Sequence, residues 1–385
     1  MASRTTHPVL DTRSLNRATL ARQLLLARAE MSAADAVEHL LGLQAQNVKP
    51  PYFQLHARLA GFRPAQLASL MESRDAVRIV TMRSTIHTHT AHDALTLRPL
   101  VQPARDREVN YFRKGLAGVD LDRLAERARA FVEAEPRTMA EIREELLKEW
   151  PGADPQSLSV AARCRLPLVQ VTPRGVWGKS GQVRLTTLGQ WVGDGRDEGP
   201  VAVDDIVLRY LGAFGPASVK DMQTWAGLTR LREAFERLRP RLVVFQDENG
   251  VELFDLPDAP RPDAATPAPP RFLPEFDNLL LSHADRARVV PPELKGRAWS
   301  GNQAHCTLLV DGFLSGLWKL DGDTLTVELF SAASEQSKES RQSKESKESK
   351  ESKEEIVAEG EALIAAMAPD GELGTGSVRF GSISG

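Results

Sequence analysis

The stretch that decides the fold is Val77-Arg78-Ile79-Val80-Thr81-Met82-Arg83-Ser84-Thr85-Ile86-His87-Thr88. It is rich in β-branched residues and alternates in polarity, which is typical of a β ribbon. Helical patterns precede it, because Ser14 and Ser32 have the residue type of helix N-caps and Pro64 suits the first turn of a further helix. Helices followed by a β ribbon indicate a winged helix-turn-helix.

The same order of elements recurs twice downstream. In the second copy, Thr138 with Glu141 three residues later forms a capping-box pattern at the start of a helix. Strands follow, and we expect one of them at Val176-Trp177-Gly178. In the third copy, helices from Val203 onward lead into two strands joined by a turn. The sequence therefore predicts an α+β protein with three tandem winged helix-turn-helix units over residues 1–118, 119–196 and 197–258.

A different pattern follows a Pro- and Ala-rich linker at residues 259–271. Short strands with Asp-Gly turns between them predict a small antiparallel sheet or β-barrel within residues 272–385. The insert at residues 334–355 repeats Ser, Lys and Glu. Because it cannot bury a core, we expect disorder or a solvated helical extension there. An amphipathic pattern over Glu355–Met367 predicts a closing helix.

Composition limits the class of protein. A chain of 385 residues with 42% hydrophobic and 26% charged residues is typical of a soluble globular protein with several structural units. The net charge of −3 does not indicate a nucleic-acid binder, although the acidic region 353–373 can mask a basic surface elsewhere. Cys164 and Cys306 lack the spacing of a zinc or iron–sulfur site. With no apolar run for a membrane span or signal peptide, we expect a cytoplasmic protein without metal or cofactor.

Gln44 and Gln46 stand shortly before the double proline Pro50-Pro51. A helical pattern leads into this stretch, and we expect the prolines to end that helix and to hold Lys49 in an extended conformation. On an extended segment, residues two apart point the same way, so both amides can face one small target. The alternative is that the two amides satisfy backbone groups at the helix end.

Five groups of residues resemble, in the same order, motifs of the bacterial winged-helix DNA glycosylases of the AlkZ/YcaQ type. They are Leu41-Gly42-Leu43-Gln44-Ala45-Gln46; Met82-Arg83-Ser84-Thr85-Ile86-His87; Gly215-Pro216-Ala217-Ser218 with Asp221 and Trp225; Leu273-Pro274-Glu275-Phe276-Asp277 with Arg286; and Val310-Asp311-Gly312-Phe313 with Gly316-Leu317-Trp318. The resemblance spans nearly the whole chain. It implies three tandem winged helices and a C-terminal antiparallel β-barrel, arranged as a C-shaped clamp on double-stranded DNA, and we expect a monomer.

The resemblance also implies a reaction. Members of the family excise bulky N-alkylated purines and unhook interstrand crosslinks. The Gln-x-Gln form is that of a branch associated with self-resistance to alkylating natural products. Gln44 and Gln46 are then the expected catalytic residues. Alkylation at N7 or N3 makes the base cationic and a good leaving group, so two amides that orient a water can suffice.

No lysine is singled out as a nucleophile, so the expected enzyme is a monofunctional glycosylase that leaves an abasic site. The rival hypothesis is a winged-helix regulator or damage sensor that binds DNA without catalysis. Three winged helices are compatible with both hypotheses. Gln-x-Gln at a helix break favours the enzyme, because a regulator has no reason to place two amides there.

Other candidates lie on the same ribbon. His87 and His89 are two residues apart and share a face, but the sequence offers no third ligand for a metal. His87 either shapes the site, contacts a phosphate or makes a structural hydrogen bond. Arg83 and Thr85 are expected to share a face as well, with Arg83 either at a DNA phosphate or in a surface ion pair. Arg83, Thr85 and His87 are therefore candidate DNA-binding residues.

Basic residues gather in the predicted third helix and wing of the second unit: Arg163, Arg165, Arg174, Lys179 and Arg184. Because a winged helix usually meets DNA at these elements, we expect this set to contact the DNA backbone, while any one of them alone can be solvated surface. Asp277, Asp285 and Arg286 fit a structural ion-pair network better than the lining of a cleft.

Overall fold

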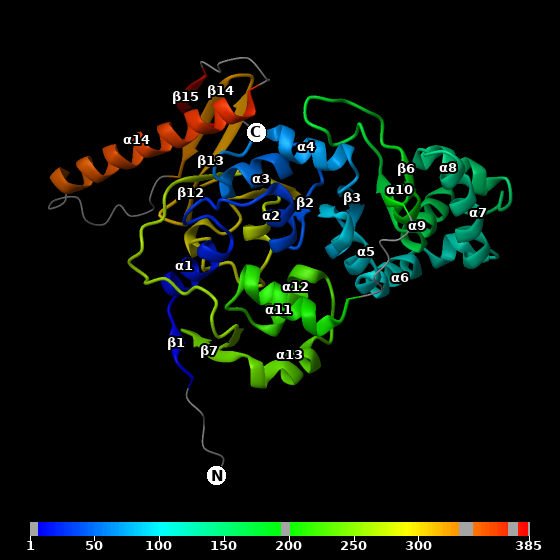
Figure 1. The fold of residues 1–385 in the computed structure, drawn as a ribbon, viewed down its shortest axis with the longest axis horizontal. Coiled ribbons are helices and arrows are strands. Elements are labelled where there is room, and N and C mark those ends of the chain that lie inside the picture. The colour runs from blue at the N-terminus through cyan, green and yellow to red at the C-terminus, as the bar shows by residue number, and fades with distance from the viewer. Residues whose placement is uncertain (1–6, 194–200, 331–341, 369–375, 384–385) are drawn as a thin grey trace, which may run out of the picture.

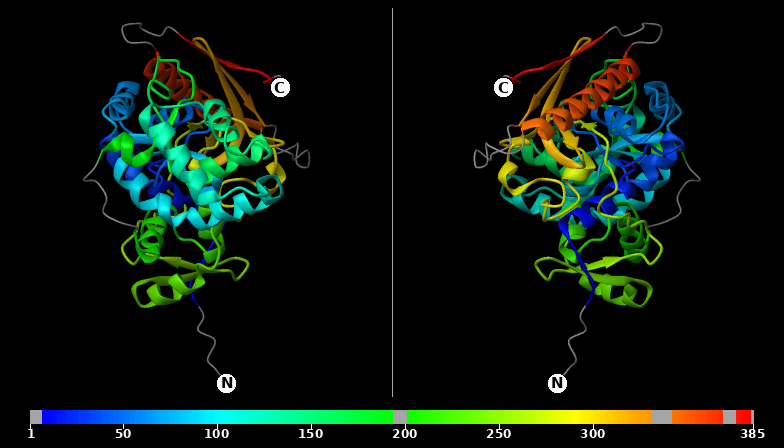
Figure 2. Two further views of the ribbon diagram at one scale, coloured as in Figure 1. Left: turned by 90° about the vertical axis from the view of Figure 1, so that its right-hand side faces the viewer. Right: turned by 90° about the vertical axis from the view of Figure 1, so that its left-hand side faces the viewer.

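The computed structural model describes residues 7–193, 201–330, 342–368 and 376–383. It is an α+β fold, as predicted. The C-terminal sheet and its long helix lie at one end of the molecule, and a group of three helices with a hairpin lies at the opposite end (Figure 1, Figure 2). A second helical group, α7 to α9, projects at the side (Figure 1).

The elements follow the chain in four groups. The first is β1 (Val9–Leu10), α1 (Thr12–Arg22), α2 (Ala33–His39), β2 (Leu43–Gln44), α3 (Pro50–Arg58), α4 (Pro64–Glu72), β3 (Ala76–Val80), the short 3-10 helix η1 (Met82–Ser84), β4 (Ile86–Thr90), α5 (Ala91–Leu100) and α6 (Gln102–Tyr111). The second is α7 (Leu121–Ala134), α8 (Met139–Leu147), α9 (Pro155–Arg165), β5 (Leu168–Gln170), β6 (Leu185–Thr187) and α10 (Leu188–Val192). The third is α11 (Val203–Phe214), α12 (Val219–Ala226), α13 (Arg232–Leu238), β7 (Val243–Asp247) and β8 (Glu252–Asp255). The fourth is β9 (Arg271–Leu273), β10 (Trp299–Ser300), β11 (Gln303–Ala304), β12 (Thr307–Val310), β13 (Phe313–Asp321), β14 (Thr324–Leu329), α14 (Gln342–Met367) and β15 (Ser377–Phe380).

Local signals place most helix starts where the sequence predicts them. Ser32 caps α2, Thr138 begins the capping box of α8, and Pro64 is the first residue of α4. Helix α1 is the exception, because its cap is Asp11 and not Ser14. The Asp11 carboxylate accepts from the backbone N–H of Ser14 at 2.7 Å, which satisfies the first turn three residues earlier than predicted.

Apart from β1, the strands of the first two groups form one sheet, in the order β2-β4-β3-β5-β6. Gln44 of β2 pairs with His87 of β4, so the candidate stretch is the edge strand of this sheet. Ile79 of β3 pairs with Val169 of β5, which joins the first group to the second. The conformation around Gln44 therefore depends on a sheet that extends well beyond the first group.

The second ribbon departs from the prediction. Residues 171–184 form a long connection between β5 and β6, and Val176-Trp177-Gly178 is not a strand. The Trp177 ring instead packs against Tyr52 and Phe53 of α3, with ring centroids 4.9 and 6.2 Å apart. Tyr52 also donates to the Gly175 carbonyl at 2.7 Å. Packing of the Trp177 ring against α3 stabilises this segment more than strand pairing would. The periodicity of the sequence could not predict it, because α3 lies more than 100 residues earlier in the chain.

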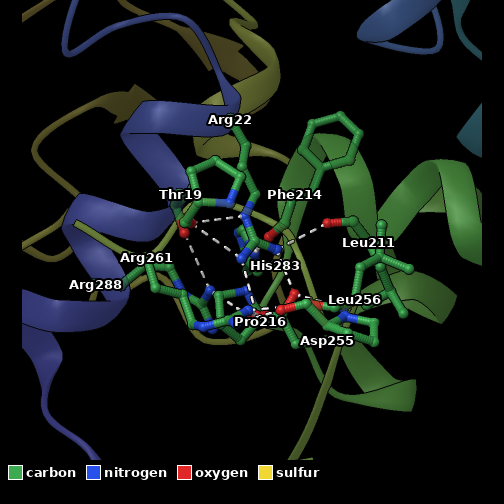
Figure 3. Close-up of polar contacts among 12 residues, drawn as sticks. Thr19, Arg22, Leu211, Phe214, Pro216, Asp255, Leu256, Arg261, His283 and Arg288 are labelled. Carbon is green, nitrogen blue, oxygen red and sulfur yellow. Dashed lines mark hydrogen bonds and ion pairs between the residues drawn. The ribbon is translucent and has the colours of Figure 1, made fainter. Parts of the chain in front are cut away.

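A buried ion pair joins α1 to the third group (Figure 3). Both Nη atoms of Arg22 donate to the Asp255 carboxylate, at 2.5 and 2.9 Å, and both side chains are fully buried. Arg22 also donates to the Leu211 carbonyl at 3.0 Å, and Arg261 donates to Asp255 at 2.6 Å. Since β1 pairs in parallel with β7, the start of the chain is fastened to the third group twice.

The C-terminal sheet has the order β15-β14-β13-β12-β9. Strands β12 to β14 confirm the predicted strands, and α14 confirms the predicted closing helix and continues it back through residues 342–354 of the insert. Residues 334–341 of the insert lie outside the described residues. Strand β15 runs parallel to β14 because α14 is a crossover connection between them. Among the described strands no pairing joins β15 to β9, so the sheet is open and the predicted closed antiparallel barrel is not found.

The sheet and the first helices share a hydrophobic core. Phe53 of α3 packs edge-on against Trp318 of β13, and Leu363 of α14 lies in the same cluster. None of the helices in the described ranges combines the length and apolar character needed to cross a membrane.

The Arg22–Asp255 pair gives a first test. Asp255→Ala would leave the buried guanidinium of Arg22 without its carboxylate, and we expect the free energy of unfolding to fall by about 3–5 kcal/mol. The matched control is Asp204→Ala, which removes the partner of the half-exposed Arg237 and should cost about 1 kcal/mol or less. Urea denaturation of both variants measures the difference, and equal losses would contradict the assignment.

Candidate functional site

The candidate site begins where α2 ends. The helix closes at His39, and Leu41 and Gly42 take left-handed conformations with φ of 56° and 92°. A side chain at Gly42 would collide with the ring of His89, so the position requires glycine for space as well as for conformation. The chain then enters β2. The predicted helix into Gln44 is wrong in its end point. The predicted extended conformation is confirmed at Gln44, but the strand ends there and Gln46 lies in a bend, so the common face of the two amides stays a prediction.

The double proline acts differently from the prediction. Pro50 and Pro51 are the first residues of α3 and do not end the preceding helix. Lys49 is helical, with φ −80° and ψ −37°, and is not extended. Proline suits the first turn of a helix because the backbone N–H groups it lacks have no partner there. This preference outweighs the opposing tendency of a residue that precedes proline, here Lys49, to avoid helical geometry.

Gln44 is buried and held on several sides. Its Oε1 accepts from Nη2 of Arg83 at 2.6 Å, and its backbone carbonyl accepts from Nε2 of Gln54 at 3.0 Å. No hydrogen bond among the described residues uses the Nε2 group of Gln44, so this end of the amide is available to a ligand. Gln46 lies two residues on and is exposed. One amide is therefore fixed and the other is accessible.

Arg83 is the residue that fixes Gln44. It lies in η1 with φ 54°, and its guanidinium donates to Gln44, to the Trp225 carbonyl at the end of α12 and to Nε2 of His87. Burial and the nearby guanidinium of Arg286 lower the pKa of Arg83 to about 10, so it remains charged at neutral pH. None of the ion pairs formed by residues of the described chain involves it.

The structure corrects the expected relation of Arg83 to Thr85. The ribbon is two strands joined by η1, so the two residues do not alternate along one strand. The Thr85 hydroxyl donates to the Met82 carbonyl at 3.0 Å and helps to close this turn. The turn needs left-handed residues at both Arg83 and Ser84, a conformation that their residue types do not indicate.

His87 and His89 lie side by side as predicted, with stacked rings 5.6 Å apart. Nδ1 of His87 lies 3.0 Å from the Thr85 carbonyl, which can only accept, so this nitrogen carries the proton and Nε2 accepts from Arg83. Burial lowers the pKa of His87 well below its usual range and that of His89 to about 4. Both rings are thus neutral at pH 7. Within the described residues no group of three possible ligands for a metal occurs.

Residues 275–278, from the C-terminal part of the chain, contact the stretch around Gln44. Oε1 of Glu275 accepts from Nδ2 of Asn47 at 2.7 Å, and Nδ2 of Asn278 donates to the Gly42 carbonyl at 2.7 Å. Asp277 forms a fully buried pair with Arg58 of α3, as expected for a structural ion pair. The sequence did not place Glu275 at the site because 228 residues separate it from Asn47. Its only signal was its occurrence in the Leu273–Asp277 motif.

Comparison with known proteins identifies the family. The family model "DNA glycosylase AlkZ-like" matches residues 37–366. The chain belongs to the AlkZ-like DNA glycosylase family. The interstrand DNA cross-link repair glycosylase of Streptomyces sahachiroi is 23% identical over 337 residues, covering 80% of this chain and 88% of that protein. The solved structure of S. sahachiroi DNA glycosylase AlkZ has the same fold, with a TM-score of 0.71, 19% identity and coverage of 97% of this chain and 100% of that one.

In this AlkZ-like glycosylase, most of the basic residues expected to bind DNA make ion pairs or hydrogen bonds within the protein. Arg163 and Arg165 of α9 pair with Glu108 and Asp122, and Lys179 pairs with Glu72 of α4. Of the other two, Arg184 donates to the Pro136 carbonyl at 2.6 Å. The side chain of Arg174 is half-buried. Their contact with DNA remains a prediction, since each exposed ion pair is weak enough to open for a phosphate.

Arg83 is expected to act through Gln44. Arg83→Ala should lower the single-turnover rate of base excision at least about 10-fold, because the amide of Gln44 loses its fixed orientation. In a Gln44→Ala background the same substitution should add little, since the group that it positions is gone. The alternative role, a phosphate contact, would make the two effects additive and would reduce the salt slope of DNA binding by about 0.9.

The buried histidines predict an acid-sensitive fold. Burial lowers the pKa of His56 and His283 to about 3, as it lowers that of His89 to about 4. The unfolded chain binds these protons near pH 6.5 and the folded chain does not, so the free energy of unfolding should fall as pH drops below about 6.5. Each such histidine contributes about 1.4 kcal/mol per pH unit. Urea denaturation between pH 7 and pH 5 measures the slope, and His89→Gln should reduce it by about one histidine's share.

Proposed function

We propose that this chain is a monofunctional DNA glycosylase that hydrolyses the N-glycosidic bond of bulky N7- and N3-alkylated purines and unhooks interstrand crosslinks. The observation that carries the proposal is the fixed amide of Gln44, held by Arg83 with its Nε2 group unused, two residues from the exposed Gln46. Membership of the AlkZ-like family supports the reaction class. The S. sahachiroi relative is named as an interstrand DNA cross-link repair glycosylase, which supports crosslinks as substrates.

In the proposed mechanism the two amides take opposite roles. Because Oε1 of Gln44 is occupied by Arg83, Gln44 donates from Nε2 to a lone pair of the attacking water. Gln46 accepts a hydrogen bond from the same water through Oε1. The water is held with its remaining lone pair toward the sugar C1′, and oriented dipoles stabilise the cationic sugar as the bond to the base breaks. The leaving base needs no proton, because its alkyl group already makes it cationic.

The larger architecture is part of the proposal. We take residues 1–118, 119–196 and 197–258 as three winged helix-turn-helix units, 259–271 as a linker and 272–385 as the C-terminal sheet domain, together a C-shaped clamp that holds duplex DNA as a cytoplasmic monomer. Residues Arg163, Arg165, Arg174, Lys179 and Arg184 are proposed to contact the DNA backbone, with Arg83, Thr85 and His87 shaping the site beside Gln44. Self-resistance to an alkylating natural product stays a prediction.

A strand-scission assay tests the proposal. Purified protein is incubated with a duplex that carries one N7-alkylguanine, and abasic sites are then cleaved with alkali. We expect scission by the wild type, with losses of about 100-fold in Gln44→Ala and Gln46→Ala at unchanged DNA affinity. Gln66→Ala, at an exposed position on α4, is the matched amide control and should retain full activity. Tight binding without scission in the wild type would favour the regulator or damage sensor.

A further inference from the structure

Hydrolysis leaves one proton without a place in the mechanism. As water forms its bond to C1′ and the C1′–N bond breaks, the bonding electron pair leaves with the base and neutralises its charge. The water oxygen that is now bonded to C1′ still carries both hydrogens and a positive charge, and it must lose one proton to become the hydroxyl of the product. An amide carbonyl is a very weak base, so neither Gln44 nor Gln46 can take that proton. The buried rings of His87 and His89 have strongly lowered pKa values and are equally unsuited to hold it at neutral pH.

Glu275 is the carboxylate that the fold brings to this place. Its Oε1 accepts from Asn47, the residue that follows Gln46, and its Oε2 accepts from the Cys306 thiol at 3.2 Å. Each carboxylate oxygen has a second lone pair, so both contacts leave acceptor capacity. Burial raises the pKa of the Cys306 thiol, which therefore stays protonated and remains a donor.

Three contacts fix the position of this carboxylate relative to the Gln44–Gln46 stretch. Asn278 ties the segment to the Gly42 carbonyl, two residues before Gln44. Asp277 ties it to α3 through both Nη atoms of Arg58, at 2.7 and 2.8 Å. Phe276, which lies between Glu275 and Asp277, holds a left-handed conformation with φ 59°, which costs energy in a residue of this type. These contacts hold the segment in one position, as a catalytic group requires.

The charge of Glu275 is not explained by a structural role. Asp277, Asp255 and Asp93 are buried carboxylates that each face an arginine within 3 Å. Glu275 is half-buried, its two partners are both neutral, and none of the ion pairs among residues 7–193, 201–330, 342–368 and 376–383 includes it. A neutral glutamine would satisfy Asn47 equally well. A negative charge kept at this position without a counter-ion is suited to a site where positive charge develops on the sugar.

We propose that Glu275 is a catalytic residue, the proton acceptor for the attacking water in the reaction proposed above. In the transition state the water accepts from Gln44, donates to Gln46 and donates its other hydrogen to the Glu275 carboxylate. The proton passes to Glu275 as the C1′–O bond forms and is then released to solvent. While the sugar is cationic, the same carboxylate stabilises it by Coulomb attraction. This inference rests on the proposed glycosylase function.

Glu275→Gln tests this role, because it removes the charge and keeps an oxygen that accepts from Asn47. We expect its single-turnover rate on N7-alkylguanine DNA to fall by about 100-fold or more with DNA affinity unchanged. Glu275→Asp keeps the charge and should retain more activity than Glu275→Gln. Glu328→Gln, a half-buried glutamate of β14 bonded to the Ile383 backbone, is the matched control and should behave as the wild type.

Two further readouts separate catalysis from structure. The pH–rate profiles of the wild type and of Glu275→Gln should differ if this carboxylate accepts the proton, and they should coincide if its role is structural. Added formate should restore part of the rate of Glu275→Ala, whereas a purely structural role would give no rescue. A Glu275→Gln rate within about three-fold of the wild type, with the same pH profile, would overturn this inference and leave the roles of Gln44 and Gln46 standing. An inactive wild type would overturn both.

Discussion

The hydrogen bonds of Arg83 hold the candidate site together. Its guanidinium reaches the amide of Gln44 on β2, the carbonyl of Trp225 at the end of α12 and the ring of His87 on β4. One side chain thereby links the first and third groups of helices and orients the amide of Gln44, which we propose to be catalytic. The arrangement needs the neutral tautomer of His87 and a left-handed turn at Arg83 itself. This explains why a short 3-10 turn interrupts an otherwise regular ribbon.

The site combines few charges with many fixed dipoles, which suits a leaving base that is already cationic. Arg83 brings a positive charge close to Gln44 and occupies its Oε1, which leaves Nε2 for the proposed water. The carboxylate of Glu275 accepts from Asn47, the residue after Gln46, and is proposed to offset the positive charge that develops on the sugar. Neither histidine changes its protonation at neutral pH, so the rings serve orientation. In the proposed mechanism the chemistry is carried out by the two amides, one carboxylate and one water.

Local signals in the sequence predicted much of this fold. The caps at Ser32 and Thr138 and the presence of strands around His87 depend only on near neighbours, and the structure confirms them. The alternation in polarity does not correspond to alternating burial, because β3 and β4 are buried at nearly every position. Signals were ambiguous where one residue type serves two purposes: Pro50 can end a helix or open one, and here it opens α3. The extended backbone at Gln44 was predictable, but its partner Arg83 was not, because a left-handed turn at an arginine has no signature. Trp177 and Glu275 were missed because their partners lie in distant parts of the chain.

We propose that the site acts only on a base that is already cationic, because neither its two amides nor Glu275 supplies a proton to the leaving base. Single-turnover excision from two duplexes that differ only in one base, 7-methylguanine or uracil, tests it most directly. We expect ready excision of 7-methylguanine and a rate for uracil lower by at least about 1,000-fold, since uracil needs leaving-group activation that the site does not supply. Uracil excision at a rate matching that of 7-methylguanine would contradict the claim.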